Sequence, residues 1–261
     1  MLKIENLSIC YEGNSQTSVE NFNLEVAKGE IVCIVGESGS GKSSILKAVL
    51  GALSKSVQIK GEIMFEERAL LDQSLSEWQN IRGTKLSMIF QDSNGSLNPV
   101  RKIGKQYEEY IIQHEPMNTS QARERAKAML KKMDLHNAEN ILNSFPHQLS
   151  GGMTQRVSIA IALTFTPEVL LADEPTSALD VVIQKQVVEE LLRVRKNFNT
   201  AIVLVTHNLA LGAYMADKLI VMEKGRIVDS GAVLDVLEHP KSIYTKKLLA
   251  AVPELEREAY V

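Results

Sequence analysis

The 261-residue sequence has few cysteines, few aromatic residues, no block of basic residues and no long hydrophobic run. Its two cysteines, Cys10 and Cys33, lie in apolar, strand-like stretches, which indicates buried free thiols in a reducing compartment rather than disulfides. A net charge of −3 without a basic cluster argues against a nucleic-acid partner. The N-terminus lacks the apolar segment of a secretion signal, and no run is long enough to span a bilayer. We therefore expect any membrane association to come through a partner.

The composition that remains is that of a globular protein with a full core. Hydrophobic residues make up 44% of the chain, and the mean hydropathy is −0.06. This length has room for one large α/β domain, or for one domain with an inserted subdomain.

Residues 36–43, with the sequence GESGSGKS, fit the phosphate-loop pattern, in which a glycine and four further residues precede Gly-Lys-Ser. An apolar strand is predicted before the loop (31–35) and a helix after it (44–50), which is the context that such a loop requires. Backbone N–H groups and the helix N-terminus would hold the phosphates, Lys42 would reach the β- and γ-phosphates, and Ser43 would ligate Mg²⁺. The predicted nucleotide-binding residues here are Gly36, Glu37, Ser38, Gly39, Ser40, Gly41, Lys42, Ser43 and Ser44.

A flexible Gly/Ser turn is the alternative interpretation of this loop, but a turn has no need of the Lys-Ser pair at this spacing. Short strands with polar turns are predicted before the loop, at 2–4, 7–11 and 22–26. Tyr11 ends the second of these strands. Its ring could stack on a nucleotide base or simply cover a sheet edge, and the spacing does not separate the two.

The residue pattern changes after the predicted strand 85–90, which ends at Gln91. Residues 92–99 are a dense cluster of turn formers, and residues 101–145 have helical periodicity, including a helix at about 120–133. We interpret this block as an inserted helical subdomain.

A second chemical cluster begins with Leu-Ser-Gly-Gly at 149–152, and a helix is predicted from there to about Phe165. An apolar strand then ends in Asp173 and Glu174, where α/β sheets bind ligands. Asp173 would hold Mg²⁺, and Glu174 could accept a proton from the attacking water. Two solvated acids at a strand end are the alternative. After the helix 181–196 and the strand 200–206, His207 lies at the same kind of strand end, and a hairpin (219–229) closes the fold.

Taken in order, these motifs, together with Ser-Ala-Leu-Asp at 177–180, resemble the ATP-binding cassette (ABC) ATPase family over residues 1–250. The resemblance implies an α/β phosphate-loop NTPase fold of the ABC type, with a mixed sheet, N-terminal antiparallel strands and the helical insertion. It implies one domain over 1–261: a core (about 1–90 and 165–230), a helical signature subdomain (about 92–164) and a helical tail (about 231–261).

The resemblance also implies roles for the motif residues, with ATP and Mg²⁺ as cofactors. Glu174 would be the general base, His207 would hold the γ-phosphate and the attacking water, and Gln91 would touch the Mg²⁺ and sense the γ-phosphate. Tyr11 would stack on adenine. Ser150, Gly151 and Gly152 would clamp the nucleotide that is bound by an opposite subunit. Asp180 would connect the two nucleotide sites.

Weaker signals point to the ATPases of peptide and nickel importers. The first is FQD followed by SLNPV at 90–100. The others are PHQ at 146–148, just before the Leu-Ser-Gly-Gly segment, and YTKKLL at 244–249 with Pro253 near the end. The absence of any cysteine after Cys33, in a chain ending at Val261, favours the shorter nickel or metal-chelate importers over oligopeptide importers.

The implied partners are a second ABC subunit (a paralogue or an identical chain), two transmembrane permeases and an extracytoplasmic binding protein. The implied location is peripheral, on the cytoplasmic face of the cell membrane.

Two other functions stay open at this point. A cassette ATPase that acts on DNA or ribosomes would show a coiled-coil insertion, a second cassette or a basic stripe, and the sequence has none. A regulatory module without turnover would be expected to lack Glu174 or His207, and both are present.

Overall fold

The structure is a computed structural model that describes residues 1–12, 17–177 and 179–251. Its contacts divide the chain into two compact units. The first unit combines Met1–Leu75 with the described part of Asn199–Val261, and the second is Ser76–Phe198. Of the predicted features, Ala178, Pro253 and the last ten residues of the helical tail lie outside the described residues.

The first unit contains two sheets. One is antiparallel with the strand order β2-β1-β4-β5, and the other has β10, β9, β3 and β8 side by side in that order. In the second sheet β3 is parallel to both β8 and β9, while β9 and β10 form an antiparallel hairpin, so the sheet is mixed. The strands of this unit are β1 (Leu2–Cys10), β2 (Val19–Val26), β3 (Ile31–Gly36), β4 (Gln58–Phe65), β5 (Arg68–Ala69), β8 (Ala201–Thr206), β9 (Lys218–Glu223) and β10 (Arg226–Ala232).

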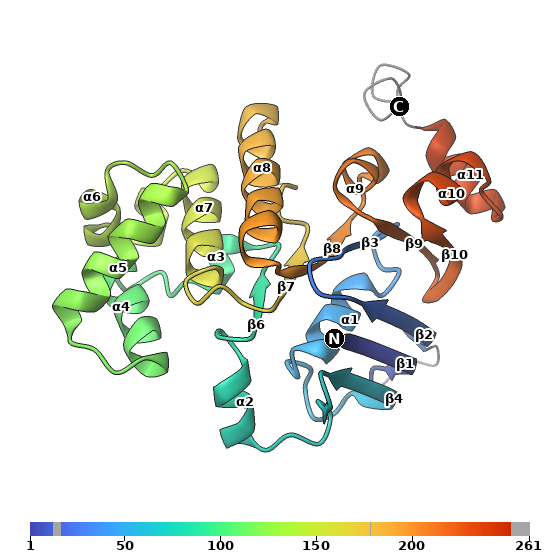
Figure 1. The fold of residues 1–261 in the computed structure, drawn as a ribbon, viewed down its shortest axis with the longest axis horizontal. Helices are drawn as coiled ribbons and strands as arrows, with labels where there is room; N and C mark the ends of the chain where they lie inside the picture. The colour runs from blue at the N-terminus through green and yellow to red at the C-terminus, as the bar shows by residue number, and fades with distance from the viewer. Residues whose placement is uncertain (13–16, 178, 252–261) are drawn as a thin grey trace. The chain divides into compact units, whose positions relative to one another are not determined.

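Strands β3 and β8 are apolar except for Thr206 at the end of β8, and all of their residues are buried. This is the pattern of a parallel strand covered on both faces. Figure 1 shows α1 on the side of β3 that faces the antiparallel sheet, and α9 on the other side. The helices of this unit are α1 (Lys42–Val49), α9 (Leu209–Met215), α10 (Val233–Glu238) and α11 (Ile243–Ala250). The buried Cys33 thiol lies in β3, and burial raises its pKa, so it stays protonated. Cys10 is only half-buried.

The prediction of two strands before residue 12 was wrong, because β1 is one strand from Leu2 to Cys10. The polar residue Asn6 takes a left-handed conformation, with φ 51°, and the pairing with β4 shifts register between Glu5 and Ser8. Asn6 tolerates this conformation better than most residues, and its N–H donates to the Asn23 side chain at 2.9 Å. The polar residues therefore produce an irregularity within the strand and not a turn.

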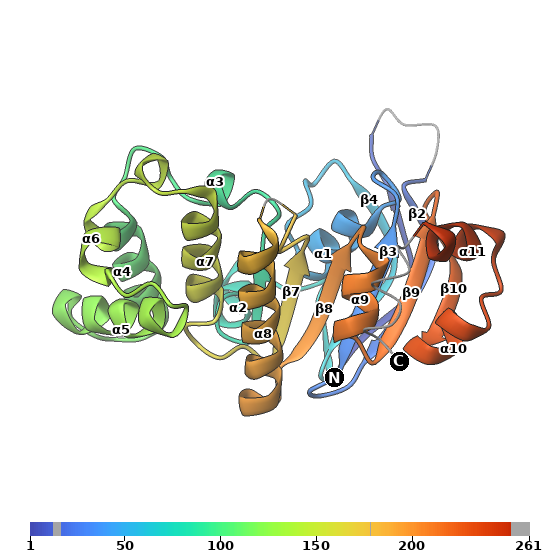
Figure 2. The same ribbon diagram turned by 90° about the horizontal axis from the view of Figure 1, so that it is seen from above.

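The second unit contains the parallel strands β6 (Leu86–Ile89) and β7 (Val169–Asp173) and most of the helices. Helices α4 to α7 lie together in Figure 2. Arg123 on α5 joins two neighbours, since it donates to Glu108 of α4 at 2.6 Å and to Glu139 of α6 at 2.7 Å. The helices are α2 (Leu75–Ile81), α3 (Ser93–Ser96), α4 (Ile103–His114), α5 (Thr119–Lys132), α6 (Ala138–Asn143), α7 (Gly151–Ala162) and α8 (Val181–Phe198), with a 3₁₀ turn η1 at Pro146–Gln148.

The helical insertion and the mixed α/β class are confirmed, with small differences at element ends. Helix α7 stops at Ala162 and not near Phe165, because Thr166 is left-handed (φ 48°) and Pro167 follows it. Helix α8 continues to Phe198 and ends before the left-handed Asn199. Part of the turn cluster 92–99 forms the short helix α3. No helix among the described residues is long and apolar enough to cross a membrane.

Candidate nucleotide-binding and hydrolysis site

The phosphate loop joins the buried strand β3 to helix α1, as the sequence predicts. Strand β3 delivers Gly36 to its carboxyl end, and α1 begins at Lys42 without an acidic residue in its first turn. A Cβ atom on Gly36 would lie 2.2 Å from the carbonyl oxygen of Met222 in the neighbouring strand β9, so only glycine fits there. The loop thus leads directly into the positive end of a helix, which favours an anion.

Gly39 and Gly41 both have left-handed backbones, with φ of 82° and 95°, but their surroundings differ. A Cβ at Gly41 would lie 2.5 Å from the carbonyl oxygen of Ser18, whereas a Cβ at Gly39 would meet no atom within 4 Å.

We predict that Gly41→Ala lowers both stability and nucleotide affinity more than Gly39→Ala does. Each substitution places alanine in the left-handed region, at a cost of about 1–2 kcal/mol. Only Gly41→Ala also forces a backbone oxygen to move. Denaturant midpoints and equilibrium nucleotide binding of the two variants check this. Equal losses in both would contradict it.

Lys42 is almost completely buried, with 5% of its surface exposed. Its ammonium group donates to the carbonyl oxygens of Gly36 at 2.8 Å and Glu37 at 2.7 Å, and to the Ser40 hydroxyl at 3.3 Å. A buried cation held on three oxygens of its own loop is positioned before any ligand arrives.

Tyr11 lies beside the start of α1, because its hydroxyl is 2.8 Å from the Ser44 hydroxyl. The structure thus brings together Tyr11 and the loop, 33 residues apart in sequence. This contact is compatible with both interpretations of Tyr11, base stacking and cover of a sheet edge.

Within the second unit, β7 ends at Asp173, which is buried to 4% exposure, and Glu174 follows with a left-handed backbone, φ 44°. A non-glycine residue with positive φ is uncommon, and such backbone often occurs at functional sites. The Gln91 amide donates to the Glu174 carboxylate at 3.3 Å. Two predicted catalytic residues, 83 positions apart in sequence, are therefore neighbours in space.

The Leu-Ser-Gly-Gly segment at 149–152, the signature segment, starts helix α7. The Ser150 hydroxyl accepts from the N–H of Met153 at 3.3 Å, so this serine is the N-cap, and both glycines follow in the first turn. Gly152 lies next to Leu179, since a Cβ on Gly152 would be 3.7 Å from the Leu179 side chain. Asp180 caps the next helix, because its carboxylate accepts from the N–H groups of Val182 and Ile183, both at 3.0 Å.

Two residues of these surroundings were missed by the sequence analysis. Gln155 is buried in α7 and donates to the carbonyl oxygen of Pro175 at 2.9 Å, which ties the signature helix to the loop after β7. Its position one turn after Gly151 could have suggested that it lies on the same helix face. Tyr244 of α11 accepts a hydrogen bond from the N–H of Glu37, and no local signal connects those two residues.

The predicted residues are divided between the units. The phosphate loop, Tyr11 and His207 belong to the first unit, and the other predicted site residues belong to the second. His207 is exposed and follows β8, in the short link before α9, where Asn208 accepts from the N–H of Leu211 at 3.1 Å and caps that helix.

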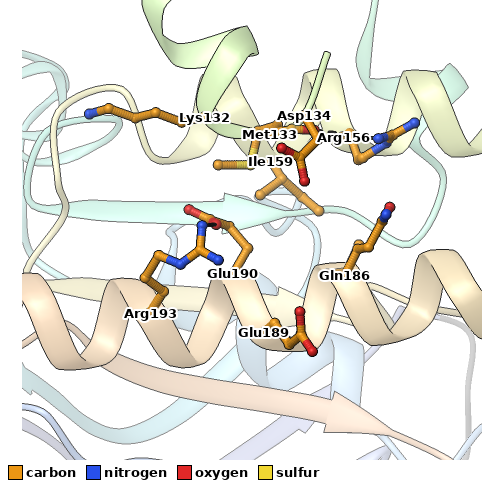
Figure 3. Close-up of a pocket in the computed structure, with 10 residues that line it drawn as sticks. Lys132, Met133, Asp134, Arg156, Ile159, Gln186, Glu189, Glu190 and Arg193 are labelled. Atoms are coloured by element: carbon orange, nitrogen blue, oxygen red, sulfur yellow. Dashed lines mark hydrogen bonds and ion pairs between the residues drawn. The ribbon is translucent and has the colours of Figure 1, made fainter. Parts of the chain in front are cut away.

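A separate small cavity of about 40 Å³ lies in the second unit, among the end of α5, helix α7 and helix α8 (Figure 3). Asp134 and Arg156 line it from one side and Glu190 and Arg193 from the other. This volume is far too small for a nucleotide. None of the predicted site residues lines it.

Known proteins are similar to this chain in sequence and in fold. The sequence profile of the ABC transporter family matches residues 19–177. The oligopeptide transport ATP-binding protein OppD of Bacillus subtilis (strain 168) is 41% identical over 260 residues, which are 98% of this chain and 73% of OppD. The dipeptide transport ATP-binding protein DppD of Lactococcus lactis subsp. cremoris (strain MG1363) is also 41% identical, over 98% of this chain and 74% of DppD.

A solved structure of the ATP-binding cassette MJ0796, a dimer in a post-hydrolysis state bound to ADP and Pi, is also similar. It superposes with a TM-score of 0.79 at 30% identity, over 89% of this chain and 99% of MJ0796. The chain belongs to the ABC transporter family. It is an ATP-binding and ATP-hydrolysing subunit with the ABC type of phosphate-loop fold, as the resemblance implied.

Proposed function

We propose that this chain hydrolyses ATP to drive the uptake of short peptides through two partner permeases, as a peripheral subunit on the cytoplasmic face of the cell membrane. The observation that carries the proposal is the 41% identity, over 98% of the chain, to transport ATP-binding proteins named for oligopeptides and dipeptides. A further relative, 39% identical, is named a glutathione import ATP-binding protein, and this chain covers 42% of its length. These names favour peptides over the nickel or metal-chelate substrates that the sequence analysis preferred.

In the proposed catalytic cycle, Lys42 binds the β- and γ-phosphates, and the N–H groups of the loop surround them. The burial of its ammonium group on loop oxygens supports this role. Glu174 takes a proton from the attacking water, His207 holds the γ-phosphate and that water, and Gln91 senses the γ-phosphate. The Gln91–Glu174 hydrogen bond supports a shared task for these two residues.

Mg²⁺ would be held by the Ser43 hydroxyl, Gln91 and Asp173, where it would neutralise phosphate charge. The donor set fits this ion. The described residues contain no group of three or more His, Cys, Asp or Glu side chains that could hold a metal alone. Mg²⁺ needs no such cage, because it usually keeps waters and binds one or two carboxylates together with substrate phosphates.

We further propose that the chain acts as one ABC domain, with a core, a helical signature subdomain and a C-terminal helical tail, and pairs with a second ABC subunit, identical or paralogous. Ser150, Gly151 and Gly152 would clamp the nucleotide of the opposite subunit. The exposure of Ser150 and Gly151 at the N-terminus of α7 supports this. Asp180 would connect the two sites, and Tyr11 would stack on adenine. The permeases would receive peptide from an extracytoplasmic binding protein.

The substrate class is tested with the assembled transporter, reconstituted in liposomes with its binding protein. We expect short peptides to stimulate ATP turnover and to accumulate in the lumen, and we expect nickel chelates to do neither. The Lys42→Ala complex controls for contaminating ATPases. Stimulation by nickel chelates alone would replace the peptide proposal, and stimulation by neither class would contradict a peptide importer.

A further inference from the structure

The C-terminal part of the described chain reaches the phosphate loop through a hydrogen bond. The hydroxyl oxygen of Tyr244, on α11, accepts a hydrogen bond of 2.9 Å from the N–H of Glu37, 207 residues away in sequence. Tyr244 is half-buried, and burial raises the pKa of its phenol, so the hydroxyl is protonated and neutral. Both residues belong to the first unit.

The start of α11 is held firmly, which places Tyr244. The carboxylate of Asp229 on β10, itself 4% exposed, accepts from the N–H groups of Lys241 at 2.7 Å and Ser242 at 3.3 Å. The Ser242 hydroxyl then accepts from the N–H of Thr245 at 3.1 Å and caps the helix. Tyr244 therefore extends from a helix end that a buried acid fixes to the sheet.

The N–H that Tyr244 receives belongs to the peptide group between Gly36 and Glu37. The carbonyl oxygen of the same peptide group accepts from the Lys42 ammonium at 2.8 Å. A peptide group is planar, and its N–H and C=O point in opposite directions. Rotation of the plane would break both bonds, so the Tyr244 hydroxyl and the Lys42 ammonium hold it from its two sides.

We propose that Tyr244 is a positioning residue for nucleotide binding. Its hydroxyl holds the first peptide group of the phosphate loop in the orientation that presents Gly36 oxygen to Lys42. It thereby keeps the Lys42 ammonium in place before ATP arrives. The inference rests on the proposed role of Lys42 in binding the phosphates.

Tyr244→Phe tests this, because it removes the hydroxyl and keeps the ring. We expect the full chain to bind ATP about three- to tenfold more weakly, the effect of one hydrogen bond. In the assembled transporter we expect KM for ATP to rise by the same factor, with kcat within about twofold, since pre-organisation acts on binding before the chemical step. Tyr214→Phe, at an exposed tyrosine of α9, is the matched control and should change neither value.

A purely structural role would lower the unfolding midpoint without changing KM, so thermal unfolding is measured on the same samples. Asp229→Ala, which frees the start of α11, should also weaken ATP binding if Tyr244 acts through its placement. The inference would be overturned if Tyr244→Phe had the wild-type Kd and KM for ATP while Lys42→Ala no longer bound ATP. That result would leave the proposed function intact. Wild-type binding by Lys42→Ala would instead overturn the assigned loop. A fall in kcat at unchanged KM in Tyr244→Phe would also overturn the inference.

Discussion

Glu174→Gln is expected to reduce ATP turnover by about 100-fold or more while ATP still binds, the loss that follows when a general base is removed. Glutamine has the shape of glutamate, but its amide cannot accept the proton of an attacking water. The side chain at this position is placed by a left-handed backbone directly after β7, and it accepts a hydrogen bond from Gln91. The substitution therefore removes the chemistry and changes little of the geometry.

The measurement is steady-state ATP hydrolysis by the assembled transporter, together with equilibrium binding of a labelled nucleotide. Glu168→Gln is a suitable control, because Glu168 lies just before the other end of β7, is half-buried and pairs with Lys85 at 3.3 Å. It should keep turnover close to wild type. Near-normal turnover in Glu174→Gln would show that this residue is not the base.

Lys42→Ala is expected to weaken ATP binding by about 100-fold or more. The variant loses the ammonium that would bind two phosphate groups, and charge-assisted hydrogen bonds contribute about 1.5–3 kcal/mol each. It also leaves the carbonyl oxygens of Gly36 and Glu37 without this donor, so the loop loses its internal support.

Nucleotide titration of the full chain checks this expectation. Lys47→Ala, at an exposed lysine of the same helix, should bind ATP like the wild type. Lys42→Arg keeps the charge but is a planar fork that cannot occupy the compact site of an ammonium, so it should also bind poorly. Unchanged affinity in Lys42→Ala would count against this loop as the nucleotide site.

Local sequence was sufficient to predict the elements that carry the chemistry. The phosphate loop, the strand that ends at Asp173 and the helix that follows Leu-Ser-Gly-Gly each depend on residues within a few positions of one another, so their conformations follow from local patterns. The same is true of the β9–β10 hairpin and of the helical insertion. The prediction failed at residues 5 and 6, where a polar pair normally indicates a turn. Strand β1 pairs with β2 on one side and β4 on the other, and it therefore continues through the left-handed Asn6 as one strand.

The motifs and their order along the chain determined the family and the candidate residues. Tertiary structure decided which of them meet. Gln91 reaches Glu174 because β6 and β7 are parallel neighbours with the same carboxyl edge. Gln155 reaches Pro175 through the packing of α7, and Tyr244 reaches Glu37 because a buried carboxylate fixes the start of α11. Such contacts join residues far apart in sequence, and they form only when burial of the apolar faces brings the elements together.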